Sequence, residues 1–158
     1  MPKTALKHSI IALLVLIIPL LSIIFWDFLQ LKFVYLFTDI GSDTFNLQYP
    51  NLLHKSNYKA AEGQSIWWSF NVGMGQNLFN GYKFTLADIP TLFTHHLGIA
   101  QQIIYHELFK IISCALLFML YLHLIGLQAF TVLLGSLLYA FSGYLIVGSS
   151  WYVHSSLI

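Results

Sequence analysis

The sequence predicts an all-α membrane protein with about three transmembrane helices and one long outer loop that contains interfacial helices. Hydrophobic residues make up 58% of the 158 residues and charged residues only 8%, whereas a soluble domain carries about 25% charged residues. No Asp, Glu, Lys or Arg occurs in residues 8–26 or after Lys110, and a helix needs about 20 mainly apolar residues to cross a bilayer. The net charge of +1 indicates neither a nucleic acid nor an acidic partner. The expected partner is the lipid bilayer, and no nucleic-acid partner is expected.

The first crossing is predicted over residues 9–29. Lys3 and Lys7 precede it, and the positive-inside rule therefore places the N-terminus in the cytoplasm and the following loop outside the cell membrane. Trp26 and Tyr35 then come near the outer interface, where amphipathic rings prefer to lie.

The same segment has the basic start of a cleaved signal peptide. Its apolar stretch is longer than the core of a usual signal peptide, however, and no small-x-small cleavage site follows Leu21. We therefore predict a retained anchor. Pro19 in its middle removes one backbone hydrogen bond, so a kink is expected there.

Residues 32–98 are predicted to form the outer loop. The loop holds most of the acidic residues of the chain and is also rich in aromatic residues, which a disordered linker would not be. Over residues 43–54 apolar side chains recur at helical spacing, which predicts an interfacial helix, although Pro50 interrupts it.

The second crossing is predicted over residues 104–125 and the third over residues 129–147, with a tight inner turn between them. Small residues in and after the third helix favour close helix approach; they are Gly135, Ser136, Gly143 and Gly148. Residues 152–158 resemble the approach to another membrane segment, so residues 1–158 are expected to form one membrane region of a larger protein, truncated at the C-terminus.

Two carboxylates, Asp39 and Asp43, follow the first crossing at a spacing of four residues, so on a helix they would share a face. A carboxylate partly shielded from water at the membrane surface can act as a general base. It could instead bind a divalent cation that neutralises phosphate oxygens. The third alternative is that both are solvated loop acids, with Asp43 capping a helix.

The segment from Trp67 to Gly81 combines aromatic rings, amides and glycines. Gly73-x-Gly75 lacks the third glycine and the preceding strand of a dinucleotide site. The glycines could let the backbone approach a sugar or a head group while a Trp ring stacks on the sugar; the alternative is a tight turn docked on the membrane. The candidate substrate-binding residues are Trp68, Asn71, Gly73, Gly75, Gln76 and Asn77.

The histidines suggest no metal site. His95-His96 and His106-Glu107 match no familiar ligand spacing, so we interpret them as polar residues of the membrane interface. His123 lies within the second crossing, where it could be functional or form an interhelical hydrogen bond.

Three stretches together carry a resemblance to a known family. Gln48-Tyr49-Pro50 closes the acidic segment, Trp68-Ser69-Phe70-Asn71-Val72-Gly73-Met74-Gly75-Gln76-Asn77 follows, and Tyr139-Ala-Phe-Ser-Gly-Tyr144 lies in the third predicted helix. From residue 37 onward the chain resembles the N-terminal part of bacterial YfhO-type membrane proteins.

The resemblance implies part of a larger polytopic glycosyltransferase of the GT-C type. Such an enzyme takes a sugar from a polyprenyl-phosphate carrier at the outer face of the membrane and modifies a cell-surface polymer such as lipoteichoic acid. An acidic residue of the first outer loop acts in catalysis in these enzymes, and that role falls on Asp43 or, as the second candidate, on Asp39. The resemblance implies no cofactor, although a divalent cation is compatible with the acidic segment.

Two other classes of function stay open. A transporter or flippase component would use the outer loop as a lid, and the near absence of charge within the predicted crossings argues against it. The other class is a non-catalytic membrane scaffold or the remnant of a broken gene, and neither would need a catalytic or substrate-binding site. Residues 1–158 without further helices are expected to be inactive.

Overall fold

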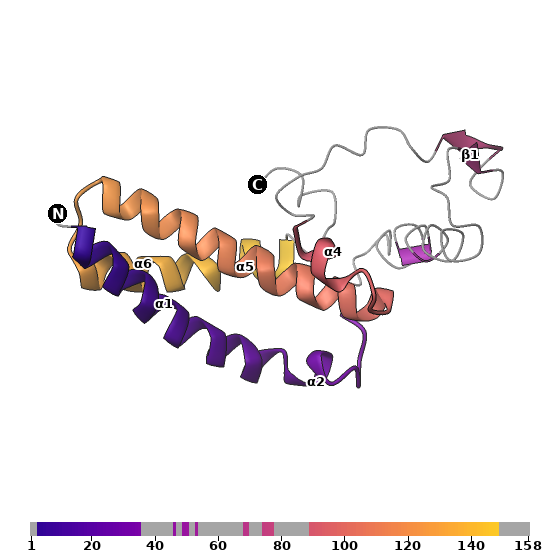
Figure 1. Cartoon of the computed structure of the whole chain (residues 1–158), viewed down its shortest axis with the longest axis horizontal. Helices are drawn as coiled ribbons and strands as arrows, with labels where there is room; N and C mark the ends of the chain where they lie inside the picture. The colour runs from indigo at the N-terminus through magenta and orange to yellow at the C-terminus, as the bar shows by residue number, and fades with distance from the viewer. Residues whose placement is uncertain are drawn as a thin grey trace.

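A computed structural model describes residues 3–35, 46, 49–50, 53, 68–69, 74–77 and 89–148. Three helices build an elongated bundle: α1 (Lys3–Ile24), α5 (Ile99–Leu124) and α6 (Ala129–Ala140). α1 and α6 run in one direction and α5 runs in the other (Figure 1). The shorter elements are α2 (Trp26–Leu29), α4 (Ile89–Thr94), the π-helical turn η3 (Tyr144–Gly148), which follows α6, and the strands β1 (Trp68–Ser69) and β2 (Gln76–Asn77).

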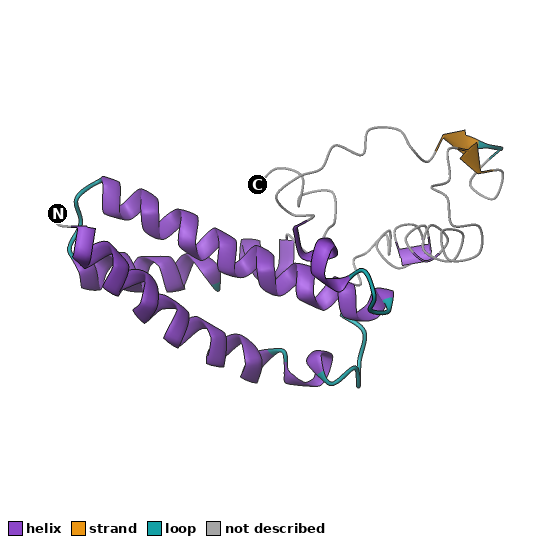
Figure 2. Cartoon of the chain, in the orientation of Figure 1, coloured by secondary structure: helices purple, strands orange, loops and turns teal. Residues whose placement is uncertain are grey.

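The described part of the chain is helical apart from this one pair of two-residue strands, which lies beyond the end of the bundle (Figure 2). Two helices, α1 from Leu6 to Ile24 and the whole of α5, are long and apolar enough to cross a membrane. The 26 residues of α5 extend about 39 Å at a rise of about 1.5 Å per residue, which exceeds the roughly 30 Å of a hydrocarbon core. These helices coincide with the first and second predicted crossings, so the helical fold class is confirmed.

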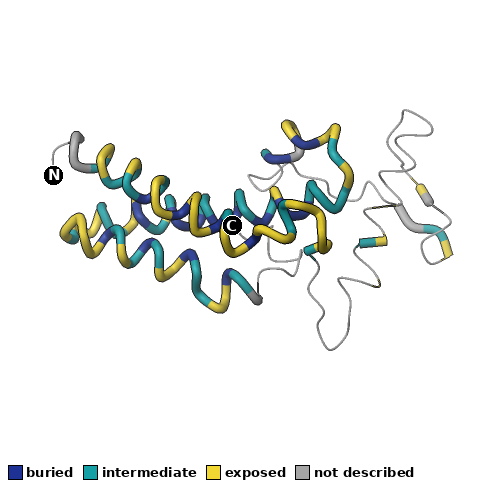
Figure 3. The backbone as a smooth tube through the Cα atoms, turned by 90° about the horizontal axis from the view of Figure 1, so that it is seen from below, coloured by how far each residue is buried: buried dark blue, intermediate teal, exposed yellow. Residues whose placement is uncertain are grey.

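Buried residues recur along all three helices (Figure 3), and they pack together in one core cluster. On α1 the buried positions repeat every four residues, as expected for one face of a helix. The members that form the core are Leu13, Ile17, Leu21 and Phe25 at α1, Ile104, Ile111, Ala115 and Met119 on α5, and Val132 and Ala140 on α6.

Small residues let α5 and α6 pack closely, as predicted. A Cβ atom on Gly135 would lie only 2.8 Å from Cδ1 of Leu122 on the facing helix. Ser136 is fully buried, and its hydroxyl donates to the carbonyl oxygen of Val132 at 2.6 Å, which satisfies it within α6. A Cβ atom on Gly143 would meet open space, so this residue serves no close approach.

The first predicted helix is divided in the structure. α1 runs through Pro19 and ends at Ile24, and Phe25 separates it from α2 with backbone angles φ −99° and ψ 17°. Phe25 stays in the core because its ring packs edge-on against Tyr35, with ring centroids 5.5 Å apart. The interruption therefore follows the aromatic packing at this end of the bundle rather than the proline.

The third predicted helix, over residues 129–147, is also divided. α6 ends at Ala140, and the π-helical turn η3 follows after Ser142 and Gly143. Both residue types weaken a helix, Gly through backbone entropy and Ser through competing hydrogen bonds. The carbonyl oxygen of Ser142 accepts bonds from the amides of Leu145 and Ile146, which starts the new turn.

Within the predicted outer loop, the described residues of the stretch 43–54 have helical backbone; they are Asn46, Tyr49, Pro50 and Leu53. This agrees with the predicted helix in that stretch. α4 packs beside the first turns of α5 and joins it through a short turn.

Candidate functional site

Half of the predicted substrate-binding residues lie in the strands of a β-hairpin. Trp68 pairs with Asn77 and Ser69 pairs with Gln76 in antiparallel register, and Gly75 directly precedes the second strand. Asn71 and Gly73 belong to the connection between the strands and lie outside the described residues. The hairpin thus brings together Trp68, Gly75, Gln76 and Asn77 over a short span of the chain.

Gly75 gives the hairpin its particular geometry. Its φ of +108° is a conformation that residues with a Cβ atom rarely adopt. A Cβ atom here would also lie 3.0–3.2 Å from the indole ring of Trp68. The indole therefore lies directly against the backbone of Gly75, while 53% of Trp68 stays exposed to solvent. A half-exposed ring on a glycine backbone can stack on the apolar face of a sugar.

Both predicted catalytic carboxylates, Asp39 and Asp43, lie outside the described residues. The chain is described up to Tyr35, which is four residues before Asp39.

A second group of polar residues lies inside the bundle. On α5 the ammonium of Lys110 is 2.5 Å from Oε2 of Glu107, and the two side chains are only 6% and 8% exposed. Both residues lie on the stripe of α5 that is otherwise buried and apolar, between Ile104 and Ile111. Ionised side chains inside a membrane-spanning helix are costly and are commonly functional.

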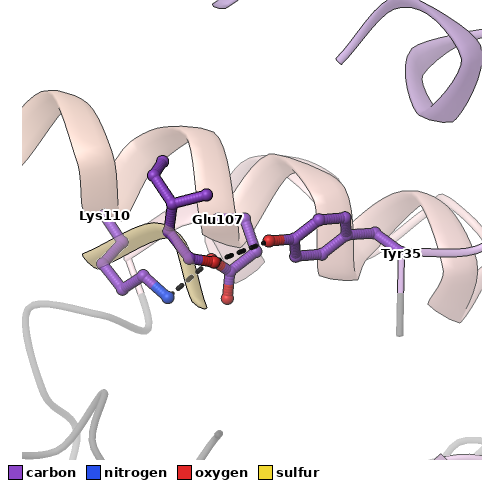
Figure 4. Close-up of polar contacts among 4 residues, drawn as sticks. Tyr35, Glu107 and Lys110 are labelled. Carbon is purple, nitrogen blue, oxygen red and sulfur yellow. Dashed lines mark hydrogen bonds and ion pairs between the residues drawn. The ribbon is translucent and has the colours of Figure 1, made fainter. Parts of the chain in front are cut away.

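Tyr35 joins this ion pair to two other elements. The ring packs edge-on against Phe25 and Phe28, with centroids 5.5 and 5.2 Å away. The hydroxyl donates to the carbonyl oxygen of Ile146 in η3 at 3.2 Å. In Figure 4 the Tyr35 side chain points toward Glu107 and Lys110. The sequence predicts this ring near the outer interface; the structure adds that it packs against the bundle.

Burial raises the pKa of the Tyr35 phenol to about 12, and the negative charge of Glu107 contributes in the same direction. Both causes favour the neutral phenol. Tyr35 is therefore a hydrogen-bond donor throughout the physiological pH range.

The four histidines considered in the sequence occupy three separate places. His95 and His96 are exposed in the turn after α4, with their rings edge-to-face at 5.6 Å, while His106 and His123 lie on α5 and are half-buried. Among the residues that the structure describes, no group of three or more His, Cys, Asp or Glu side chains could hold a metal ion.

Sequence reasoning missed the buried ion pair. The sequence predicted Glu107 as a polar residue of the membrane interface and did not pair it with Lys110. The sequence contains an indication of this ion pair: the two residues are three positions apart on an apolar helix, and this spacing places opposite charges side by side on one face. Continuing the buried stripe from Ile104 to Ile111 would have included both residues.

Comparisons of the chain with protein-family models, with curated proteins and with solved structures found no match.

Proposed function

We propose that this chain is a membrane-embedded part of a glycosyltransferase that takes a sugar from a polyprenyl-phosphate carrier and attaches it to a cell-surface polymer of the teichoic acid type. The observation that carries the proposal is the indole of Trp68, half exposed and held against the backbone of Gly75. This arrangement suits the apolar face of a sugar ring. The resemblance of residues 37–158 to YfhO-type membrane proteins supports the same chemistry.

The apolar surface of the bundle supports a location in the membrane. α1 leaves large aliphatic side chains at its outer surface, including Val15 at 64% and Ile23 at 73% exposure. A water-soluble protein rarely exposes an apolar surface of this extent. In this proposal α1 with α2, α5, and α6 with η3 form three crossings, and the loop between α2 and α4 faces the outside.

In the proposed reaction Asp43 is the general base, with Asp39 as the alternative. The carboxylate takes the proton of an acceptor hydroxyl while that oxygen bonds to the anomeric carbon of the sugar. The bond between the anomeric carbon and the phosphate oxygen breaks, and the phosphate leaves on its lipid. A divalent cation held by the acidic segment would neutralise the charge on that phosphate.

The test is the Asp43→Asn variant in the native membrane, supplied with polyprenyl-phosphate glucose or N-acetylglucosamine and isolated lipoteichoic acid. Loss of a base of this kind lowers a rate by about 10²–10⁴-fold. Asp88→Asn is the matched control, because it removes another carboxylate of the same loop. Full transfer by Asp43→Asn and Asp39→Asn at normal protein levels would remove the proposed catalytic role.

A second experiment addresses the sugar-binding hairpin. Trp68→Leu removes the aromatic face, and we expect the KM for the lipid-linked sugar to rise by about tenfold, as for loss of one stacking contact of roughly 1–1.5 kcal/mol. Trp68→Phe retains an aromatic face and should bind the donor more tightly than the Leu variant. Equal KM values for the two variants would contradict stacking on Trp68.

One observation favours a transporter or flippase as the second candidate. The Glu107–Lys110 pair is buried within a helix that can span the membrane, and buried charges of this kind commonly mark a transport path. Under this alternative, Glu107→Gln would abolish translocation of a fluorescent polyprenyl-phosphate lipid across proteoliposomes, whereas Asp43→Asn would not.

A further inference from the structure

The interruption between α6 and η3 lies at a depth where a membrane helix normally continues. α6 ends at Ala140 after 12 residues, which is about 18 Å from its start at a rise of about 1.5 Å per residue. In the proposed membrane location, where the turn before α6 faces the cytoplasm, the interruption lies inside the roughly 30 Å hydrocarbon core. The ring of Tyr139 stacks on Phe118 with centroids 4.3 Å apart, which holds this part of α6 against the spanning helix α5.

The interruption leaves two backbone groups without a hydrogen bond. The amide of Ser142 donates to the carbonyl oxygen of Tyr139, so the chain makes one tighter turn after α6. Among the described residues, however, nothing bonds to the carbonyl oxygen of Phe141 or to the amide of Gly143, and Gly143 is exposed. Lipid tails cannot satisfy such groups, so non-helical backbone at membrane depth has to be covered by protein or by water.

The surroundings favour protein over water as the cover. The residues that α6 exposes before the interruption include the apolar Leu134 and Leu138, and no Asp, Glu, Lys or Arg occurs after Lys110. A water-filled path through a membrane protein is usually lined by polar or ionisable side chains. This face of the bundle is therefore suited to a neighbouring helix.

The shape and chemistry of this face make it complementary to itself. A Cβ atom on Gly143 would meet no other described atom within 4 Å, so the space above its backbone is open. The next residue, Tyr144, is large and 65% exposed. The face also offers both a donor and an acceptor, because the free amide of Gly143 lies close in sequence to the free carbonyl of Phe141, and each tyrosine hydroxyl can do both.

We propose that the surface formed by Tyr139, Gly143 and Tyr144 binds a second copy of this chain about a two-fold axis. Each copy places its Tyr144 over the partner's Gly143. A two-fold interface uses the same surface on both copies, so this surface has to carry both halves of every contact. Close approach over small residues and hydrogen bonds between helices are the usual means of association in membranes. The proposal rests on the membrane location in the proposed function, but not on glycosyl transfer.

The first test measures association in liposomes. Chains with Cys114→Ala and Gln128→Cys are labelled with donor or acceptor dyes, and energy transfer is recorded against the protein-to-lipid ratio. Gly143→Ile fills the open space without meeting any described atom of its own chain, so it should keep the helical circular-dichroism signal of the parent. We expect it to raise the Kd for dimerisation by at least about tenfold, as for overpacking of a close contact.

Thr131→Ile is the matched control. It adds an apolar side chain at another exposed position of α6, three turns before the interruption, and it should associate as the parent does. Parent chains that stay monomeric at every protein-to-lipid ratio would overturn the proposal. Equal association of the parent and Gly143→Ile would overturn it as well, since the face would then be covered by something other than a second copy.

The second test examines the two-fold arrangement. Tyr144→Ala removes the large residue and should weaken association with itself. A mixture of Gly143→Ile and Tyr144→Ala chains pairs the new Ile with the new Ala, and the original Gly with the original Tyr. We therefore expect the mixed pair to associate more tightly than either variant does with itself. A mixed pair no tighter than the two variants would contradict the contact between Tyr144 and the partner's Gly143.

These measurements are independent of the proposed reaction, because they require neither a sugar donor nor a polymer. If Asp43→Asn and Asp39→Asn retain transfer while Gly143→Ile loses association, the catalytic proposal fails and the interface stands. If the parent is monomeric while Asp43→Asn is inactive, the interface fails and the catalytic proposal stands.

Discussion

Glu107 and Lys110 occupy two positions of α5 that face the other helices, where aliphatic side chains would pack without any cost of burying charge. Their mutual attraction offsets part of that cost. The pair is therefore a poor source of stability in comparison with two well-packed leucines. Removing only one partner is a different case, because an uncompensated charge then stays in apolar surroundings.

A comparison of single and double variants tests this account of the ion pair. We expect Glu107→Leu to lower the free energy of unfolding by about 3–5 kcal/mol, whereas the double variant Glu107→Leu, Lys110→Leu should be neutral or more stable by about 1–4 kcal/mol. The measurement is thermal or denaturant unfolding of the purified protein in one detergent. Equal loss in the single and double variants would contradict a buried, mutually compensating pair.

The phenol of Tyr35 should titrate later than an exposed tyrosine. Its pKa is raised from 10.0 to about 12, first through burial and second through the charge of Glu107. The folded state thus keeps its proton where the unfolded state loses it. The stabilising contribution is complete below pH 10 and disappears as the pH rises through about 12.

The difference in ultraviolet absorbance between wild type and Tyr35→Phe isolates this single phenol from the other tyrosines. We expect its midpoint near pH 12 in the folded protein and near pH 10 in denaturant. A midpoint near pH 10 in both states would show that Tyr35 is exposed.

At the scale of elements, α2 and α5 end in the same C-terminal capping pattern of backbone hydrogen bonds, built from different residues. After α2, the amide of Lys32 donates to the carbonyl oxygen of Asp27, and the amide of Leu31 donates to that of Phe28. After α5, the amides of Leu127 and Gly126 make the equivalent bonds. This pattern requires a positive φ at its central residue, and the values are 58° at Leu31 and 87° at Gly126.

Glycine adopts this conformation without strain, whereas for a residue with a side chain it costs about 1–2 kcal/mol. We therefore expect Leu31→Gly to stabilise the protein by roughly 1 kcal/mol and Gly126→Ala to destabilise it by roughly 1 kcal/mol. Unfolding midpoints measured side by side provide the check. A loss of stability in Leu31→Gly would mean that apolar contacts of this half-exposed leucine outweigh its backbone strain.

At the scale of the whole molecule, the start of α1 and the turn between α5 and α6 lie at the same end of the bundle, and the turn after α4 lies at the other (Figure 1). In the membrane these ends would face opposite sides. A Cys114→Ala protein carrying Thr4→Cys or Gln128→Cys should resist a membrane-impermeant thiol reagent added to intact cells, whereas His96→Cys should react.

Lysis should make the two protected cysteines reactive, which serves as the control for accessibility. Labelling of both Gln128→Cys and His96→Cys in intact cells would contradict a bundle that crosses the membrane. Labelling of Thr4→Cys and Gln128→Cys together, with His96→Cys protected, would instead reverse the proposed orientation.

Much of the helical architecture could be predicted from the sequence, because it depends on local patterns. Long uncharged stretches predict α1 and α5, and Gly126 with its neighbours predicts the turn before α6. The breaks at Phe25 and Phe141 could not be predicted, since they depend on contacts between distant elements and on weak helix formers near each end. Pro19, the most obvious local signal, does not end α1.

The residues of the candidate site were selected from the sequence by residue type alone. The sequence indicates the hairpin residues Trp68 and Gly75 through their types, and the structure adds the contact between the indole and the glycine backbone. The association of Tyr35 with Glu107 and Ile146 was not foreseeable. These residues come from three separate stretches, and only tertiary packing brings them together.

For a helix that spans the membrane, as proposed for α5, the position of the Glu107–Lys110 pair within one helix also bears on its insertion during synthesis. A newly made helix that carries a lone charge partitions into lipid at a cost of about 2.5–3.5 kcal/mol. The two charges of α5 can neutralise one another as soon as a single turn has formed, before α6 has been translated. Under the proposed location, α5 would enter the bilayer as an electrically neutral helix, because its two opposite charges are already paired.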